Sequence, residues 1–105
     1  MRHIAIVGVG VTALAAATAT YLFVHRSPSP QVHWALVDRY CTGCHNEKLK
    51  TGGLALDSLD LAHVSDRAEV WERVARKLRG GLMPPANRPR PDAASQDRFV
   101  TFIER

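Results

Sequence analysis

The most constraining feature of this chain is its cysteine content, which is two residues in 105, with only two positions between them. Cys41 and Cys44 are too close in sequence to build the disulfide framework that stabilises many small secreted domains. Beyond the apolar N-terminus, roughly 75 residues are left for a fold, and a domain of that size buries a thin core that usually needs a staple. His45 follows the second cysteine directly. The short segment with both thiols and the imidazole is therefore the first place to look for that staple.

The spacing Cys41-x-x-Cys44-His45 is the pattern by which haem c is attached to a protein. Two cysteines three positions apart on a helical turn point to one side, so both thiols can add to the vinyl groups of one haem. The next residue then reaches the iron from the proximal side. We predict one covalent haem c with Cys41 and Cys44 as its thioether residues and His45 as the proximal iron ligand.

Three other interpretations of the two cysteines stay open at this point. A thioredoxin-like redox pair has the same spacing but needs a βαβ context, and no segment shows convincing strand alternation. A zinc site could combine Cys41, Cys44 and His45 with His63. The two thiols could also form a simple disulfide.

A second motif, Gly80-Gly81-Leu82-Met83-Pro84-Pro85, follows later in the chain. A thioether is a weak iron ligand on a flexible stem, and prolines directly after Met83 would hold it in a stiff loop. We predict Met83 as the distal iron ligand. His63 and His33 compete for the sixth position, and an open sixth site is the remaining alternative.

The rest of the pattern predicts an all-α domain with three main helices around the cofactor. The first begins at Pro30 with Ser29 as its cap and leads into the cysteine motif, with an apolar stripe formed by Val32, Leu36 and Tyr40. Residues 46–65 are predicted to be mostly loop, anchored by scattered leucines. The second helix covers Asp66–Arg79, with a capping box at its start and glycines at its end. The third follows a cap at Asp92 and carries Phe99, Val100 and Ile103.

Residues 4–24 contain no charged side chain. A helix of this length, at about 1.5 Å per residue, would span roughly 30 Å, enough to cross a bilayer. We predict that residues 1–26 form an uncleaved, single-pass membrane anchor, or alternatively a signal peptide cleaved near residues 17–19. Residues 27–30 are a linker, and residues 31–105 form the exported domain on the periplasmic side. The last helix ends without a cap, which suggests the front end of a longer protein.

The sequence is similar to the planctomycete-type cytochrome c domain, a branch of the class I cytochromes c. The likeness covers about residues 31–105 and rests on residues 40–46 (YCTGCHN), 48–61 (KLKTGGLALDSLDL), the Trp71 helix and residues 81–85 (GLMPP). It implies a small class I-like fold, with thioethers at Cys41 and Cys44, a proximal ligand at His45 and a distal ligand at Met83. Many class I cytochromes orient the proximal histidine through a proline carbonyl. No proline occurs between residues 46 and 60, so a backbone carbonyl within residues 51–54 is expected to do this instead.

Together these features predict an electron-transfer protein and not an enzyme. The alternatives are a haem domain with an open or displaceable sixth site, acting in a larger oxidoreductase or as a gas or peroxide sensor, and a zinc-binding structural domain. The net charge of +4 is mild, and no basic run is interleaved with aromatics, so nucleic acid is not an expected partner. The expected partner is a redox protein, which an acidic surface would suit, or another domain of the same longer chain. Two basic segments each allow two interpretations. A solvated helix face or a docking patch is formed by Arg73, Arg76, Lys77 and Arg79. Residues 88–91 either hold a haem propionate or form a surface loop.

Overall fold

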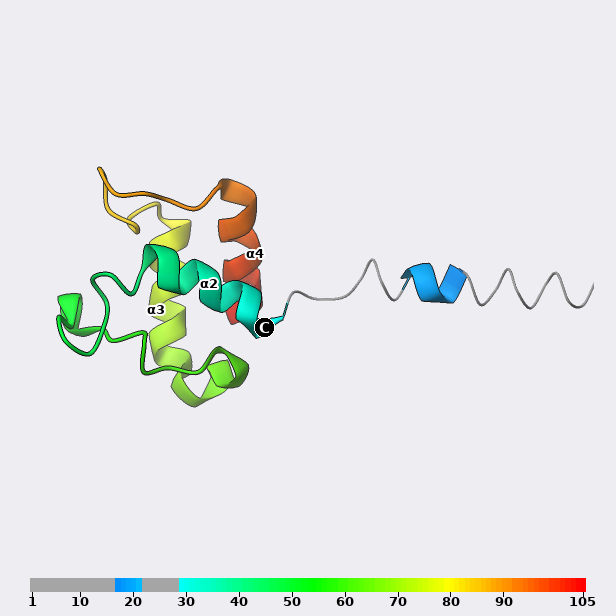
Figure 1. Ribbon diagram of the computed structural model, residues 1–105, viewed down its shortest axis with the longest axis horizontal. Coiled ribbons are helices and arrows are strands. Elements are labelled where there is room, and N and C mark those ends of the chain that lie inside the picture. The colour runs from blue at the N-terminus through cyan, green and yellow to red at the C-terminus, as the bar shows by residue number, and fades with distance from the viewer. Residues whose placement is uncertain (1–16, 22–28) are drawn as a thin grey trace, which may run out of the picture.

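A computed structural model describes residues 17–21 and 29–105, and within these ranges it contains helices and turns without any strand. The predicted all-α class is confirmed for the described residues. Residues 17–21 are helical. The elements of the domain, in chain order, are α2 (Pro30–Tyr40), two short 3₁₀ segments η1 (Thr51–Gly53) and η2 (Leu61–Arg67), α3 (Ala68–Arg79) and α4 (Ala93–Ile103). Figure 1 shows α4 alongside α3, with α2 crossing in front of them.

The predicted membrane anchor over residues 4–24 lies mostly outside the described residues, which include only positions 17–21 of it. Within the described part of the chain, no helix has the length and apolar character needed to cross a bilayer. The anchor, the signal peptide alternative and the boundaries at residues 26 and 30 therefore remain predictions.

Helix α2 begins at Pro30 as predicted, but the side chain of Ser29 makes no capping hydrogen bond. The backbone carbonyl of Ser29 accepts from the amide of Val32 instead, at 3.0 Å. The predicted apolar stripe is also partly wrong, because Val32 is 61% exposed, whereas His33 and Val37 are buried. The buried face of α2 is the one that packs on its neighbours, because the His33 ring stacks on Phe102 of α4 and Val37 belongs to the hydrophobic core.

Helix α3 begins at Ala68 instead of the predicted Asp66, and the predicted capping box does not form. Asp66 belongs to η2, and Arg67, which takes the cap position, makes no side-chain cap bond. Glu69 instead accepts a hydrogen bond from Nε of Arg67 at 2.9 Å. The reason lies at Arg67, whose φ and ψ of −135° and 46° are not helical, so residues 61–67 stay in a separate 3₁₀ segment with Leu61 buried.

Helix α4 matches the prediction closely. Asp92 caps it by accepting from the amide of Ser95 at 2.9 Å, and Phe99, Val100 and Ile103 are buried. Helix α4 packs against α3, with the Phe99 ring edge-on to the indole of Trp71 at 6.3 Å between centroids. The hydrophobic core joins all three helices and two leucines of the intervening segment: Val37, Leu56, Leu61, Val70, Trp71, Ala75, Leu78, Phe99, Val100 and Ile103.

Candidate functional site

The cysteine motif lies at the carboxyl end of α2, where the chain leaves the helix in a tight turn. The amides of Cys44 and His45 both point back to the carbonyl of Cys41, at 3.2 and 3.0 Å. Both cysteines are half-buried and free, so the disulfide alternative is not formed. The Cys41 side chain packs against the hydrophobic core. The turn therefore presents two unbonded thiols and an imidazole from five consecutive residues.

The two thiols differ in their surroundings. Burial raises the pKa of the Cys41 thiol to about 11, so this thiol stays protonated at neutral pH in the folded chain. A side-chain nitrogen of Arg88 lies 3.6 Å from the Sγ atom of Cys44. Arg88 belongs to the loop after α3 that also carries Met83. This contact therefore shows that the Met83 loop lies beside the cysteine motif.

The His45 ring is held by one hydrogen bond from its Nδ1 atom to the carbonyl oxygen of Thr51, at 2.8 Å. A carbonyl can only accept, so Nδ1 carries the hydrogen and Nε2 keeps its lone pair for a metal. Thr51 opens η1, where the positive φ angles of Gly52 and Gly53 (64° and 72°) turn the chain sharply. The expectation of an orienting carbonyl within residues 51–54 is confirmed, and the structure identifies it as that of Thr51.

Asn46 organises the loop that follows the motif, a role that the sequence analysis missed. Its Oδ1 atom accepts from the amides of Lys48 and Leu49 at 3.0 and 2.8 Å, and its Nδ2 atom donates to the carbonyl of Thr42 at 2.7 Å. The signal that could have revealed it is an asparagine at the start of a loop, where such side chains often bond the backbone two or three residues on. Asn46 thus ties the turn of the thiols to the loop that orients His45.

The Met83 loop leaves α3 through a glycine in the left-handed conformation. Gly81 has φ of +66°, its amide donates to the carbonyl of Leu78 at 3.1 Å, and the amide of Leu82 donates to the carbonyl of Lys77 at 3.0 Å. This pair of bonds is the Schellman arrangement that ends many helices. Met83 is half-buried and packs against the same hydrophobic core as Cys41.

The end of this loop folds back over its beginning. Nη2 of Arg90 donates to the carbonyl of Gly81 at 2.9 Å and to the carbonyl of Pro84. From the sequence, residues 88–91 are either a clamp for a haem propionate or a surface loop. In the structure Arg90 bonds its own loop, and Arg88 approaches Cys44.

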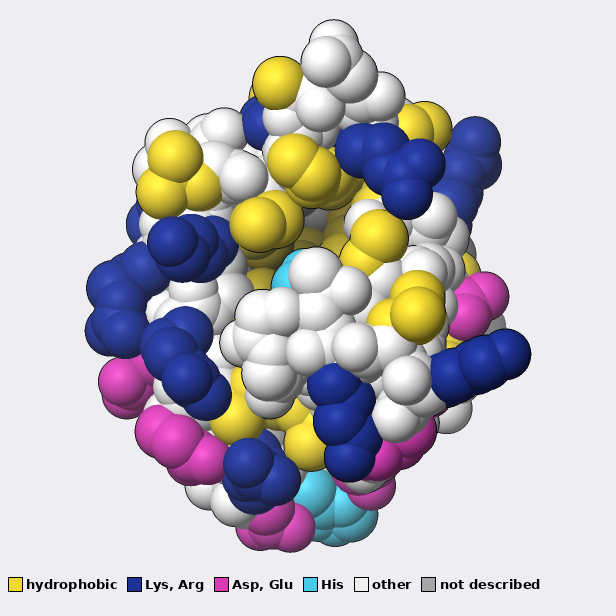
Figure 2. Space-filling view, turned by 90° about the vertical axis from the view of Figure 1, so that its left-hand side faces the viewer, with side chains coloured by type: hydrophobic (Ala, Val, Ile, Leu, Met, Phe, Trp, Pro, Cys, Tyr) yellow, Lys and Arg dark blue, Asp and Glu magenta, His cyan; other side chains and the backbone are white. Residues whose placement is uncertain are grey.

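The loops that carry both motifs project from the same side of the helices, at the left of Figure 1. Figure 2 looks onto that side and shows a hollow lined by hydrophobic side chains, with a histidine visible inside it. Trp71 is only 1% exposed, and its indole N–H has no hydrogen-bond partner among the described residues. A buried N–H without a partner destabilises the fold by about 1–3 kcal/mol. A bound group that accepts a hydrogen bond from it would remove this cost. Two thiols, an imidazole with a free Nε2, a thioether and an apolar hollow are the donor set and surroundings that haem c needs.

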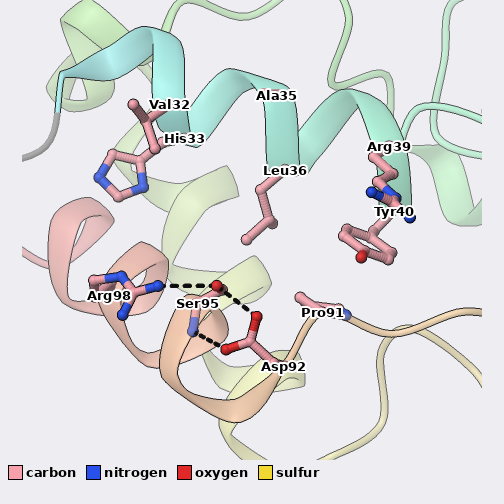
Figure 3. Close-up of a pocket in the computed structure, with 10 residues that line it drawn as sticks. All are labelled: Val32, His33, Ala35, Leu36, Arg39, Tyr40, Pro91, Asp92, Ser95 and Arg98. Carbon is pink, nitrogen blue, oxygen red and sulfur yellow. Dashed lines mark hydrogen bonds between the residues drawn. The ribbon is translucent and has the colours of Figure 1, made fainter.

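The competing histidines lie in other settings. His63 is exposed and its Nδ1 atom bonds the Asp60 carboxylate at 2.7 Å, which raises the pKa of His63. His33 is buried and lines a different cavity of about 310 Å³ between α2 and the start of α4 (Figure 3). Within the described ranges, no three histidine, cysteine or acidic side chains gather as a metal site. The zinc alternative therefore receives no support from these residues.

The comparisons with known proteins agree with this geometry. The family model of planctomycete cytochrome C matches residues 41–87, which run from the first thiol into the loop that carries Met83. No curated protein and no solved structure shows a significant match to the chain.

Proposed function

Since residues 41–87 match the family model of planctomycete cytochrome C, we propose that this chain is an electron-transfer cytochrome with one haem c ligated by His45 and Met83. The family implies a covalently bound haem, and the two cysteines of the chain suffice for one pair of thioethers. Bound haem supplies an iron that accepts one electron and gives it back. No side chain needs to act as acid, base or nucleophile, which is why we propose a carrier and not an enzyme.

The observation that carries this proposal is the hydrogen bond from His45 to the carbonyl of Thr51. It fixes the tautomer and the ring orientation before any metal is bound, so little rearrangement is needed on ligation. A rigid ligand set that is the same in both oxidation states suits electron transfer. A methionine as the second ligand, in place of a second histidine, raises the reduction potential.

The buried thiol of Cys41 indicates the order of assembly. A thiol adds to a vinyl group as its thiolate, and a pKa of about 11 leaves little thiolate at neutral pH once the domain has folded. We therefore place attachment at Cys41 before the core closes over that side chain.

The location and the partner are part of the same proposal. The uncharged stretch of residues 4–24 supports a membrane anchor or signal peptide, with the haem domain on the periplasmic side of the cytoplasmic membrane. Lysine and arginine side chains surround the hollow in Figure 2, and a redox partner with an acidic surface would be complementary to them. Such complementarity mainly speeds the encounter, so electron transfer should slow as salt is added.

The experiment that tests the proposal compares the full, haem-loaded chain with its Met83→Ala variant. The oxidised wild-type protein should show the weak far-red band of sulfur-to-iron charge transfer, and the reduced protein should resist carbon monoxide. Met83→Ala should lose the band, lower the reduction potential and open the iron to carbon monoxide, because the thioether is gone. His63→Ala is the matched control and should leave all three properties unchanged.

Four outcomes would contradict parts of this proposal. A wild-type protein that binds carbon monoxide readily would point to the open-site alternative, in a sensor or a larger oxidoreductase. An unchanged Met83→Ala variant combined with a changed His63→Ala variant would move the distal ligand to His63. If neither variant changes, Met83 is not the ligand. A colourless chain after maturation in a competent host would overturn the haem assignment itself.

A further inference from the structure

Arg90 connects the two sides of the Met83 segment through a single nitrogen atom. Its Nη2 atom donates to the carbonyl of Gly81, two residues before Met83, and to the carbonyl of Pro84, one residue after it. A guanidinium NH₂ group carries two hydrogens, so it can make both bonds at once. The methionine is thus enclosed in a short arc of backbone whose two ends share one donor.

The backbone hydrogen bonds of this loop lie on either side of Met83. On the helix side, the bond from the Leu82 amide to the Lys77 carbonyl fixes the chain as far as Leu82. On the far side, the amide of Arg88 donates to the carbonyl of Pro85 at 3.2 Å. Arg90 joins Gly81, on the fixed helix side, to Pro84, which precedes Pro85, and Met83 lies between these two residues.

The sequence around Arg90 makes the brace stiff. Pro89 and Pro91 flank it, and each proline ring restricts its own φ angle. Arginine loses less freedom per hydrogen bond than a lysine would, because its planar head is preorganised. Hydrogen bonds from a charged donor are also stronger than neutral ones.

We propose that Arg90 is a positioning residue that holds Met83 at the sixth coordination site of the haem iron. This inference rests on the proposed ligation by Met83. A thioether binds iron weakly, so the freedom of its loop competes directly with the bond. Tying Gly81 to Pro84 removes part of that freedom before ligation, which lowers the entropic cost of keeping the sulfur on the iron.

The test measures how well the iron stays closed in the full, haem-loaded chain. Arg90→Ala should weaken the far-red sulfur-to-iron band and speed carbon monoxide binding to the reduced protein by about tenfold or more, the effect of losing hydrogen bonds to a charged donor. Arg90→Lys keeps the charge but loses the planar, preorganised head, so it should restore the closed state only in part. Each variant is measured well below its own thermal midpoint, so that a general loss of stability does not open the iron.

Arg76→Gln is the matched control, because Arg76 carries the same charge near the end of α3, is exposed and bonds neither carbonyl. It should leave the band and the rate of carbon monoxide binding unchanged. If Arg90→Ala yields too little folded protein, Arg90→Gln carries the same comparison, since it keeps most of the stem but cannot reach both carbonyls.

The Met83→Ala variant separates failure of this inference from failure of the proposed function. If Met83→Ala opens the iron while Arg90→Ala behaves like wild type, the brace is wrong and the ligation stands. If Arg76→Gln opens the iron as much as Arg90→Ala, charge and not bracing is responsible, and the inference is again overturned. If Met83→Ala itself changes nothing, both proposals fall together.

Discussion

His33 is a polar residue in an apolar setting on α2. It is 3% exposed, its Nε2 atom has no partner among the described residues, and its ring stacks on Phe102 at 4.2 Å between centroids. Burial lowers the pKa of His33 below its ordinary value of 6.5, and the nearby Arg98 cation lowers it further. His33 is therefore neutral in the folded domain at neutral pH, and its imidazole behaves as a flat core side chain.

A pH dependence of stability follows for His33. The unfolded chain takes up a proton near pH 6.5 more readily than the folded chain does, so the stability present above pH 6.5 is lost as the pH falls toward the lowered pKa. We expect His33→Leu to reduce this loss, as measured by urea unfolding at several pH values above and below 6.5.

His63→Leu is the control for this measurement, with the opposite sign. The Asp60 carboxylate raises the pKa of His63, so its contribution is present below pH 6.5 and is lost as the pH rises through the raised pKa. If the His33→Leu and wild-type proteins lose stability equally on acidification, the assignment to His33 is wrong.

At the scale of an element, α4 depends on its first turn. Both carboxylate oxygens of Asp92 accept hydrogen bonds from Ser95, Oδ1 from the amide at 2.9 Å and Oδ2 from the hydroxyl at 2.7 Å. These bonds hold the pKa of Asp92 below 3.8. The helix also reaches α3 here, because the Gln96 side chain donates to the carbonyl of Leu78 at 3.2 Å.

We expect Asp92→Ala to lower the thermal midpoint of the domain, followed by circular dichroism, because the first turn of α4 loses its cap. Asp92→Asn should keep much of the cap but remove its pH dependence. In the wild type the contribution of the charged cap is present above pH 3.8 and is lost as the pH falls through the lower folded-state pKa. Asp97→Asn, on the same helix, should be neutral. Equal midpoints for Asp92→Ala and the wild type would show that tertiary packing alone sets this helix end.

At the scale of the whole molecule, one side chain connects the three helices. Phe99 of α4 is fully buried, lies edge-on to Trp71 of α3 at 6.3 Å and lies 5.9 Å from the ring of His33 on α2. No other ring in the described domain contacts both of these partners in the same way. The small core therefore depends on Phe99 more than a larger domain would.

Truncation of the Phe99 side chain should lower the unfolding free energy of the domain strongly. Phe99→Ala is expected to cost about 3–5 kcal/mol of unfolding free energy, against a total of about 5–15 kcal/mol for a typical domain. Phe99→Leu keeps most of the volume and should cost about 1 kcal/mol. Urea unfolding followed by circular dichroism measures both values. A loss below about 1 kcal/mol in Phe99→Ala would mean that the three helices are held together elsewhere.

The features that the sequence determined by itself are local ones. The all-α class, the end of α3 at its glycines and the cap at Asp92 depend on residues a few positions apart, so spacing and side-chain chemistry were enough to predict them. The same holds for Cys41, Cys44 and His45, which share one turn. Ligation by Met83 and the N-terminal anchor are also read from local patterns, and they stay predictions.

The tertiary structure decided what depends on residues distant in sequence. The non-helical backbone of Arg67 moved the start of α3, and packing against α4 determined the buried face of α2. The tertiary structure also determined which backbone carbonyls the side chains bond. His45 bonds the carbonyl of Thr51, and Arg90 bonds the carbonyl of Gly81. Every residue carries a carbonyl and every residue except proline carries a backbone N–H, so composition and spacing do not distinguish one carbonyl or N–H from another. Only the folded path of the chain brings a particular acceptor within hydrogen-bond distance of a particular donor.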